Sequence, residues 1–539
     1  MSPSGRLVGR LSGMSPGRWA GMSRVRRAGL ALLAGALSAL ALPPWHLLPL
    51  LPLGLTALLG LTLTAGSTGR AALTGWAFGT GFFALGLYWV GEAFLVDAER
   101  FAWLLPIAMP AFAGGLALYH ALVGGLLWRL AGGAQGAARP LTGALLLAAL
   151  WVLAELLRGW LFTGFPWNPL AAVWMPVDAL LQPVAWVGVA GLSLLTALAA
   201  LAPAPWLAPG RRRAWMSVAL LTPLLLAGGA GALRLSAAPG LDDPAAVVPG
   251  VRLRLVQPAI PQADKWKPEL RVGHVERQIA LSRAPGFEDF SLVIWAETAV
   301  PFALGRQDAV FAAVAAAAPP GGAVITGAPR LTPPGAPIRR MWNSVVALDD
   351  QGRQLALYDK QHLVPFGEYV PFSDLLPLPK LTEGGTDFSP GQGPRRLILP
   401  GLPPASPLVC YEIIFPEAVV DRALVPRPQW LLNLTNDGWF GSGPGPRQHF
   451  ALARLRAVES ALPVVRVANT GISAVIDSHG RVRGRLDLFE RGVLDADLPR
   501  PAATPVLAGW RNPVMGGLAL GIIVVVVALR SKSKKTAHE

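Results

Sequence analysis

Long apolar runs, separated by short charged or Pro/Gly-rich breaks, dominate the first 235 residues of the chain. A transmembrane helix needs about 20 mostly apolar residues. By that measure the sequence predicts about eight spans, near residues 28–42, 47–64, 71–93, 102–130, 140–158, 182–207, 214–233 and 513–530. The first two runs are short, so a single re-entrant hairpin is the alternative for that pair.

The pattern changes after residue 249, where short runs rich in β-branched residues alternate with helical patterns. Such alternation is typical of a layered α/β domain. We predict strands at 251–256, 292–295, 323–326, 344–348, 355–358, 407–409, 430–434, 464–467, 473–476 and 484–488, and helices at 267–283, 308–318, 416–424 and 447–460. Asp350-Gln351-Gly352 and Ser478-His479-Gly480 predict hairpin turns.

These patterns divide the chain into five segments. They are a basic N-terminus at 1–27, about seven membrane helices at 28–235, an α/β domain at 249–499, a last membrane helix at 513–530 and a basic tail at 531–539. Ala39-Leu40-Ala41 resembles a signal-peptidase site, and cleavage there is the alternative for the first helix.

Composition supports a membrane protein, because 53% of the residues are hydrophobic and only 15% are charged, against about 25% charged in soluble domains. A net charge of +15 is compatible with nucleic-acid binding. The basic residues, however, cluster beside apolar runs instead of forming the groove or stripe that nucleic acid requires. We therefore predict a membrane partner and no nucleic acid.

The basic loops predict the orientation, because Lys and Arg in short loops mark the cytoplasmic side. The loops on the predicted inner side hold Arg24, Arg26, Arg27, Arg70, Arg129, Arg139, Arg211, Arg212 and Arg213, and the tail holds Arg530, Lys532, Lys534 and Lys535. The α/β domain follows the seventh predicted span, so we expect it on the outer face of the cytoplasmic (inner) membrane.

Cys410 is the single cysteine, which excludes an internal disulfide and a cysteine cluster for zinc. The seven histidines show no metal-ligand spacing, so we predict neither a metal nor a cofactor. Cys410 follows a predicted strand, as do Glu297 and Lys360, and ligands collect at strand carboxyl ends in open α/β sheets.

These residue types suit nucleophilic catalysis. A thiol needs a base or a nearby cation to become reactive. Glu297 is the candidate base if burial raises its pKa, and Lys360 is the candidate for holding the thiolate and an oxyanion. Glu368 is the candidate for orienting Lys360.

Other interpretations of the same residues stay open at this point. Cys410 also suits an inert buried residue, and Glu297 and Lys360 suit ordinary surface charges. A papain-like Cys–His pair with His362 or His449 is a further alternative. Glu155 and Arg158 lie at helical pair spacing within a predicted span, where a functional pair and a structural pair are both possible. Trp160, Trp167, Trp174 and Tyr88-Trp89 suit interfacial anchors.

Three separated motifs together resemble the nitrilase superfamily. They are Val-Ile-Trp-Ala-Glu297-Thr, Tyr-Asp-Lys360-Gln-His-Leu-Val-Pro-Phe-Gly-Glu368-Tyr-Val-Pro and Leu-Val-Cys410-Tyr-Glu-Ile-Ile-Phe-Pro-Glu. The whole chain is similar to one membrane-bound branch, the apolipoprotein N-acyltransferase family. Further matches include Gln257 to Gln262, Lys265-Trp266, Asn433 to Phe440, Arg447 to Glu459 and Arg466 to Ser473.

The resemblance implies a nitrilase-like αββα sandwich on the outer face of a helical bundle. It implies Cys410 as nucleophile, Glu297 as general base, Lys360 as oxyanion stabiliser and Glu368 as support for Lys360. Trp266, Tyr411 and Glu412 would shape the substrate site.

The implied reaction takes an acyl chain from a phospholipid, usually phosphatidylethanolamine, through a thioester. The acceptor would be the α-amine of the diacylglyceryl-cysteine at the start of an apolipoprotein. Two other functions stay open: a membrane-tethered amidase with water as acceptor, and a transporter or scaffold whose outer domain only binds.

Overall fold

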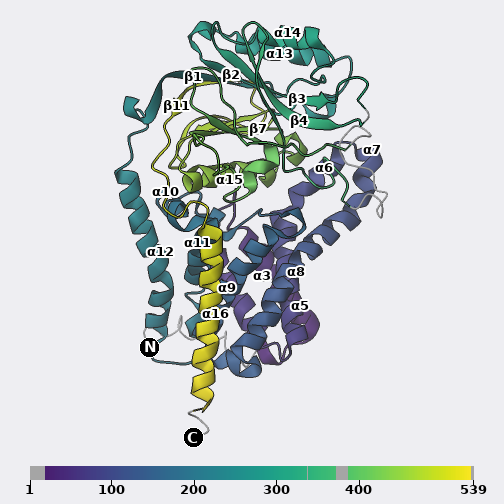
Figure 1. The fold of residues 1–539 in the computed structure, drawn as a ribbon. Coiled ribbons are helices and arrows are strands. Elements are labelled where there is room, and N and C mark those ends of the chain that lie inside the picture. The colour runs from purple at the N-terminus through teal and green to yellow at the C-terminus, as the bar shows by residue number, and fades with distance from the viewer. Residues whose placement is uncertain (1–18, 337, 372–386, 536–539) are drawn as a thin grey trace, which may run out of the picture. The chain divides into compact units, whose positions relative to one another are not determined.

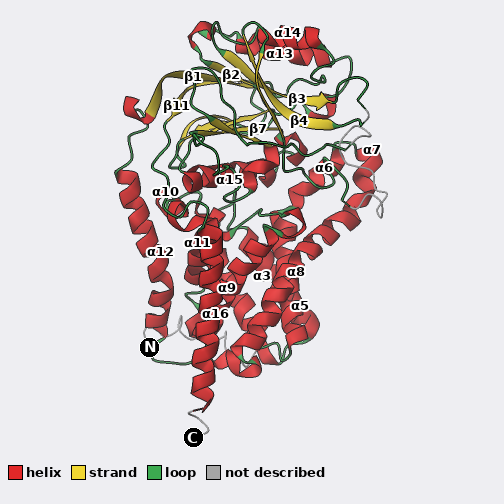
Figure 2. Ribbon diagram, viewed as in Figure 1, coloured by secondary structure: helices red, strands yellow, loops and turns green. Residues whose placement is uncertain are grey.

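The computed structural model describes residues 19–336, 338–371 and 387–535. The chain forms two compact units. The helical unit contains residues 1–88, 106–234 and 510–539, and the sandwich unit contains residues 89–105 and 235–509. Figures 1 and 2 show the elements of both units.

Apolar helices form the first unit (Figure 2). The longer helices are α3 (Arg24–Ala39), α4 (Leu50–Leu63), α5 (Thr68–Gly86), α8 (Leu105–Ala131), α9 (Pro140–Arg158), α11 (Val184–Ala200), α12 (Arg213–Ser236) and α16 (Arg511–Lys535). Their positions match the eight predicted runs, so the apolar pattern located the helices well.

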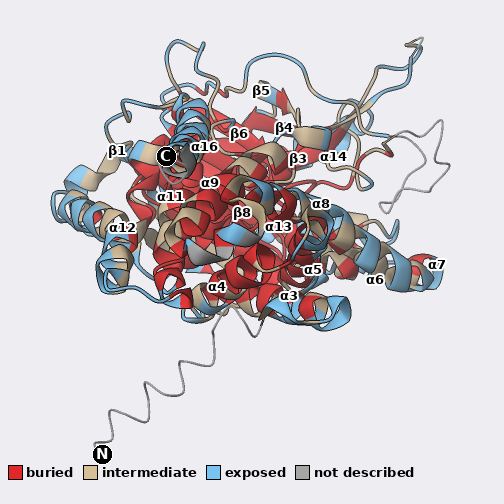
Figure 3. Ribbon diagram, turned by 90° about the horizontal axis from the view of Figure 1, so that it is seen from below, coloured by how far each residue is buried: buried red, intermediate tan, exposed pale blue. Residues whose placement is uncertain are grey.

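The predicted count of eight membrane spans is not confirmed. Among the described residues, five helices are long and apolar enough to cross a membrane, or six if the bent pair Thr68–Gly86 and Tyr88–Leu95 is one span. α4 is shorter, with 14 residues, and α3 has 16. Residues exposed on α12 and α16 form an outer surface of this unit (Figure 3), as expected of helices that face lipid.

Small residues let two helices of this unit approach closely. A Cβ atom on Gly81 of α5 would lie 2.0 Å from the carbonyl oxygen of Leu32 on α3, and one on Gly35 would lie 1.9 Å from that of Phe78. Glycine at these contact points lets the two backbones approach to a distance that any side chain would prevent, which is typical of packed membrane helices.

The charged residues within α9 bind the loop that follows the helix. Arg158 Nη1 donates to the carbonyl oxygens of Phe165 and Trp167, both at 2.6 Å. Glu155 Oε1 accepts the Leu170 backbone N–H at 2.9 Å. These bonds supply partners for backbone groups of an irregular segment, which is necessary where water is scarce. They favour the structural interpretation of Glu155 and Arg158.

The second unit contains two β-sheets. The first has the strand order β11-β1-β2-β3-β4-β5 and the second has the order β10-β9-β8-β7-β6. The strands are β1 (Val247–Gln257), β2 (Leu292–Ile294), β3 (Ala323–Leu331), β4 (Met341–Asp349), β5 (Gln354–Asp359), β6 (Ala405–Val409), β7 (Trp430–Thr435), β8 (Val464–Ala468), β9 (Ser473–Ile476), β10 (Val482–Leu486) and β11 (Gly492–Pro499).

The two sheets pack face to face between layers of helix. Buried side chains from both sheets, such as Leu255, Ile294, Leu432 and Val465, form one apolar core. A second core lies between the first sheet and α13 (Arg271–Ser282) with α14 (Asp308–Ala315). α15 (Pro444–Ser460) lies beside the second sheet (Figure 1), which gives the predicted αββα order.

One helix prediction in this unit was wrong, and one strand was not predicted. The helix predicted at 416–424 is a series of turns, and the segment Cys410–Ile414 before it forms a short 3₁₀ helix. The sequence patterns also missed β11, which pairs antiparallel with β1 and closes the edge of the first sheet. Its two aspartates are exposed and most of its other residues are only partly buried, so its apolar signal was weak.

The prediction of interfacial anchors was wrong for Trp89 and Trp167, because both indoles are buried. Trp89 belongs to the sandwich unit, where its Nε1 donates to Gln448 Oε1 at 3.0 Å and its ring packs edge-on against Phe440. By contrast, Trp160 in the helical unit is 76% exposed, as an anchor requires.

Candidate active site

Glu297 lies three residues after β2, in a segment that runs close against β3. A Cβ atom on Gly327 of β3 would lie 2.3 Å from the Thr298 nitrogen, so only glycine allows this approach. Asn343 Nδ2 on β4 donates to Glu297 Oε1 at 2.8 Å. The packing of β2, β3 and β4 thus fixes the position of a buried carboxyl group.

Lys360 directly follows β5 and is 1% exposed. Its Nζ lies 2.9 Å from Glu368 Oε2 and 3.8 Å from Glu297 Oε1. Asn343 connects the two carboxylates, because its Nδ2 also lies 3.0 Å from Glu368 Oε1. Glu368 further accepts the Val364 backbone N–H at 2.8 Å. The structure therefore brings Glu297, Lys360 and Glu368 together, as the sequence predicted.

Cys410 directly follows β6 and is buried in the core between the sheets. Its backbone φ of +50° lies in the left-handed region, which costs energy for a residue with a Cβ atom. Asn433 Nδ2 donates to the Cys410 carbonyl oxygen at 3.5 Å, and His449 Nε2 lies 3.2 Å from the same oxygen. Both contacts hold the carbonyl group of a residue with an unusual backbone conformation.

The charges around Cys410 shift the pKa values of the site. Burial and the Glu297 carboxylate raise the pKa of the Cys410 thiol well above its ordinary value, while Lys360 opposes that rise. Burial also raises the pKa of Glu297, and Lys360 offsets only part of the effect. Burial disfavours the Lys360 ammonium, but the carboxylates of Glu368 and Glu297 outweigh it and raise the Lys360 pKa. At neutral pH the site therefore holds a protonated thiol, a lysine cation and a carboxyl group of increased basicity.

A second lysine, Lys265, is also buried in this region. Its Nζ donates to the Glu297 carbonyl oxygen at 3.0 Å and to Thr298 Oγ1 at 2.9 Å. Burial lowers the pKa of Lys265 to about 8, although the charges of Glu297 and Cys410 act against the shift. We use the name triad cluster for the predicted triad of Glu297, Lys360 and the Cys410 thiol together with Glu368 and Lys265.

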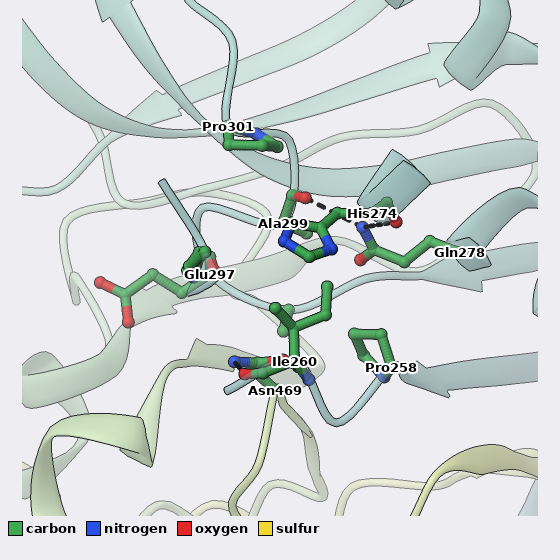
Figure 4. A pocket seen from close by; sticks show the side chains of 10 residues that line it. Pro258, Ile260, His274, Gln278, Glu297, Ala299, Pro301 and Asn469 are labelled. Carbon is green, nitrogen blue, oxygen red and sulfur yellow. Dashed lines mark hydrogen bonds between the residues drawn. The ribbon is translucent and has the colours of Figure 1, made fainter. Parts of the chain in front are cut away.

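A small cavity lies beside this cluster. Lys265, His274, Gln278, Glu297 and Asn469 are among its lining residues, and Figure 4 shows the Glu297 side chain pointing away from His274 and Gln278. Gln278 Nε2 donates to the carbonyl oxygens of Ala299 and His274. The cavity is far too small for a lipid chain and belongs to the support of the Glu297 segment.

A second set of buried charges contacts the Cys410 backbone. His449 Nδ1 lies 2.8 Å from Asp437 Oδ1, and Arg466 Nη2 donates to Asp437 Oδ2 at 2.6 Å. All three side chains are buried. Although burial acts to raise it, the pKa of Asp437 falls to about 2 because of the Arg466 charge and the His449 contact. We use the name Asp437 cluster for Asp437, His449 and Arg466.

The papain-like alternative gains no support from this geometry. His449 Nε2 faces the carbonyl oxygen of Cys410, whereas a catalytic imidazole would face the thiol. His362 stacks on Phe415 with ring centroids 3.9 Å apart, and its backbone N–H donates to Glu412 Oε1 at 3.1 Å. Both histidines thus have structural contacts.

The other predicted site residues have different environments. The Glu412 carboxylate is buried and accepts the backbone N–H groups of Val409, Gln361 and His362, so it holds the Lys360 and Cys410 segments together. Tyr411 is buried beside Phe415. Trp266 is partly exposed, and its carbonyl oxygen accepts hydrogen bonds from Arg271.

The structure adds residues that sequence reasoning did not assign to the site. Asn343 was not singled out, because an asparagine within a strand pattern carries no chemical signal of its own. Lys265, Asp437 and Arg466 stood within matched motifs but without a role, and His449 had been considered only as the base of a papain-like pair. The motif match was the available signal for these four residues, and only the folded chain shows what each contacts.

Two known protein families match this chain, one over its helical part and one over its sandwich part. Residues 252–506 match the carbon-nitrogen hydrolase family, and residues 34–202 match the apolipoprotein N-acyltransferase N-terminal domain. Fold and site together define the class: an enzyme with a nitrilase-type sandwich joined to a set of membrane helices.

The family follows from the relatives. The chain is 40% identical over 482 residues to the apolipoprotein N-acyltransferase of Rhodopseudomonas palustris, covering 86% of each chain. It is 41% identical over 522 residues to that of Bradyrhizobium diazoefficiens, covering 93% of this chain and 94% of the relative. The chain belongs to the apolipoprotein N-acyltransferase family and is therefore a membrane enzyme of the acyltransferase class.

Solved structures include an amidase from Nesterenkonia sp. that is 23% identical to this chain. The match covers 47% of this chain and 92% of the amidase, with a TM-score of 0.33. At this score the likeness adds nothing to the family assignment.

Proposed function

We propose that this chain transfers a fatty acyl group from a phospholipid to an apolipoprotein through a thioester on Cys410. Glu297 acts as general base, Lys360 stabilises the oxyanion, and Glu368 holds Lys360 in place. The observation that supports these roles is the triad cluster, where Lys360 Nζ lies near the carboxylates of Glu368 and Glu297, and the charges of Glu297 and Lys360 both act on the Cys410 thiol. Family membership supports the two lipid substrates, because the relatives are named apolipoprotein N-acyltransferases.

The first half-reaction forms the acyl-enzyme. Glu297 accepts the proton of the Cys410 thiol, and Sγ attacks the ester carbonyl carbon of the phospholipid. Lys360 stabilises the negative charge on the carbonyl oxygen of the tetrahedral intermediate. The carbon–oxygen ester bond then breaks, Glu297 returns the proton to the departing alkoxide, and a lysophospholipid leaves.

The second half-reaction discharges the thioester. The free α-amine of a diacylglyceryl-cysteine attacks the thioester carbonyl carbon, and Glu297 accepts a proton from the amine nitrogen. The carbon–sulfur bond breaks as the amide forms, and the proton returns to Sγ. Two substrates that use one site in turn give ping-pong kinetics.

The pKa directions suit this sequence of proton transfers. A thiol whose pKa is raised by burial stays protonated until a base acts on it. A carboxyl group whose pKa is raised is a stronger base than an exposed glutamate. The same group in its protonated form then serves as the acid for the leaving alkoxide.

We further propose phosphatidylethanolamine as the donor and the outer face of the cytoplasmic membrane as the location of the sandwich unit. The distribution of basic loops supports that orientation, because arginines cluster in the loops assigned to the cytoplasmic side. Trp266, Tyr411 and Glu412 remain the proposed residues that shape the substrate site.

The decisive experiment is intact mass analysis of purified enzyme after incubation with phosphatidylethanolamine and no acceptor. We expect a hydroxylamine-labile acyl adduct on the wild type and none on the Cys410→Ala variant. Addition of a diacylglyceryl peptide with a free α-amine should remove the adduct and yield an N-acyl peptide. Phosphatidylcholine with the same acyl chains tests the headgroup.

Two results would contradict the proposal. Acyl transfer that persists in Cys410→Ala would exclude the thioester. Release of ammonia from small amides, without transfer from lipid, would instead assign the amidase function. A wild-type adduct that forms equally from both lipids would retain the mechanism and reject only the donor preference.

A further inference from the structure

Two loops of the sandwich unit join into one surface just before the last membrane helix. The Gly509 backbone N–H donates to Glu417 Oε1 at 2.9 Å. The Arg422 guanidinium lies against Gly509, since a Cβ atom there would lie 1.5 Å from Nη1. Arg427 Nη1 donates to Thr504 Oγ1. The loop at 417–427 is thus fixed to the segment at 504–509.

Two valine side chains on this surface are almost fully exposed to solvent. Val425 is 87% exposed and Val506 is 98% exposed, on the two joined segments. An exposed valine alone needs no explanation. Two exposed valines on segments that contact each other, with exposed Leu507 next to Val506 in the chain, make an apolar surface that lipid can cover.

Arginines accompany the valines. Arg396 Nη1 donates to the Val425 carbonyl oxygen at 2.9 Å, and Arg422 and Arg427 flank the same tip in the sequence. The acidic side chains on these segments are Glu417 and Asp421, and each accepts a backbone N–H, from Gly509 and Ala423 respectively. The guanidinium groups also donate to protein oxygens, Arg427 Nη2 to the Ser460 carbonyl and Arg422 Nη2 to the Glu417 carbonyl. The combination of exposed valines and arginine charge suits a layer of phospholipid headgroups, because arginines near an anionic lipid surface are attracted to it.

The chain itself keeps this surface near a bilayer. Arg511, the first residue of the apolar helix α16, follows Gly509 by two residues. Five residues from Val506 to Arg511 reach at most about 18 Å, and the headgroup layer on each face of a bilayer is roughly 5–8 Å thick. Trp510 between them is 67% exposed, as is typical of an aromatic residue at a membrane interface.

We infer that Val425 and Val506, together with Arg396, Arg422 and Arg427, form a lipid-contact surface. The valines enter the boundary between headgroups and acyl chains, and the arginines bind lipid phosphates. This surface fixes the sandwich unit at the bilayer beside the start of α16. It does not depend on the proposed reaction, because no residue of the triad cluster belongs to it.

The single cysteine makes a direct test possible. In a Cys410→Ala background, Val425→Cys and Val506→Cys each carry one thiol for an environment-sensitive fluorophore. Val272→Cys on α13 is the matched control, because Val272 is also exposed (57%) and in the sandwich unit but has no chain link to α16. All variants are measured in nanodiscs of phosphatidylethanolamine and phosphatidylglycerol, with and without brominated lipid.

We expect brominated lipid to quench the labels at 425 and 506 at least about twofold more than the label at 272, with blue-shifted emission at both sites. Replacing Arg422 and Arg427 by Gln should reduce that quenching in phosphatidylglycerol-rich discs. Unfolding curves of each labelled protein, compared with Cys410→Ala alone, report whether the fold is retained.

Two outcomes overturn the inference. Labels at 425 and 506 that respond to aqueous iodide as the 272 label does, without quenching by lipid, would place the surface in water. Blue-shifted labels without quenching by brominated lipid would mean that protein covers the surface, either a second copy or another chain.

Discussion

Two sets of buried charged groups surround Cys410. The two sets differ in whether the pKa values of their groups are shifted toward neutral pH or away from it. In the triad cluster the pKa of Glu297 is raised and that of Lys265 is lowered to about 8. In the Asp437 cluster the carboxylate has a pKa of about 2. Groups whose pKa values are shifted toward neutral pH can exchange protons during a reaction. A carboxylate with a low pKa stays ionised, so it can hold its neighbours in place but cannot take up a proton.

The difference has a geometric cause. Asp437 contacts Arg466 and His449 directly, at 2.6 and 2.8 Å. Lys360 Nζ lies 3.8 Å from Glu297 Oε1 and is closer to Glu368 Oε2, at 2.9 Å. Burial without a close counter-ion therefore raises the pKa of Glu297, as its proposed role of base requires, while close partners keep the buried Asp437 ionised.

Of the substitutions that this comparison suggests, Glu297→Gln is expected to have the largest effect, a slower formation of the thioester. The amide retains the shape of the carboxyl group but cannot accept the thiol proton, so we expect thioester formation to slow by about 10²- to 10⁴-fold. The rate of acyl-adduct formation measures the loss. Glu288→Gln, on an exposed site, is the control with an unchanged rate, and a Glu297→Gln rate within about tenfold of wild type would remove Glu297 from the role of base.

Asp437→Asn should act on stability instead. The substitution removes the counter-ion of fully buried Arg466, and breaking a buried ion pair in this way costs about 3–5 kcal/mol. Denaturant unfolding of the sandwich unit, followed by its tryptophan fluorescence, measures the change. A stability equal to that of wild type, combined with a large loss of rate, would show instead that the Asp437 cluster takes part in catalysis.

Lys265→Gln should shift the pH dependence of the reaction. The Lys265 charge lowers the pKa of Glu297, so its removal raises that pKa further and moves the acidic limb of kcat/KM to higher pH. We expect a loss on the order of threefold to tenfold on the acidic side. Above about pH 8, where wild-type Lys265 loses its own proton, the two profiles should converge.

The control for this profile is Lys267→Gln, because Lys267 is half-exposed and pairs with Asp264. It should leave the acidic limb in place. A parallel loss at every pH in Lys265→Gln would indicate only a structural contact with the Glu297 carbonyl oxygen, and Lys265→Arg should restore the wild-type limb if the charge is what matters.

The smallest effect is expected for Asp487→Asn. Its side chain is 62% exposed and pairs with Arg485, also exposed, at 3.1 Å. Water screens such a pair, so the free energy of unfolding should change by no more than about 1 kcal/mol. A loss as large as that of Asp437→Asn would mean that burial does not explain the difference between the two kinds of ion pair.

Much of the fold could be predicted from the sequence. Apolar runs located the eight longer helices of the helical unit, and alternation located ten of the strands, because both patterns reflect which faces are buried. The patterns failed where burial is partial, as in β11, and where a series of turns carries a helix-like apolar pattern, as at 416–424. They also could not separate a buried tryptophan from an interfacial one, as with Trp89.

For the site, the sequence by itself determined the residue types and their order: Glu297, Lys360 and Cys410 after strands, with Glu368 eight residues beyond Lys360, within motifs that resemble the nitrilase superfamily. The tertiary structure decided which charges meet. Asn343 bridges Glu297 and Glu368 from β4, and Lys265 reaches the Glu297 segment from 32 residues earlier in the chain. The left-handed backbone of Cys410 depends on contacts from β7 and α15. Proton affinities depend on burial and on distances of a few ångströms, and only the packing of the two sheets fixes those.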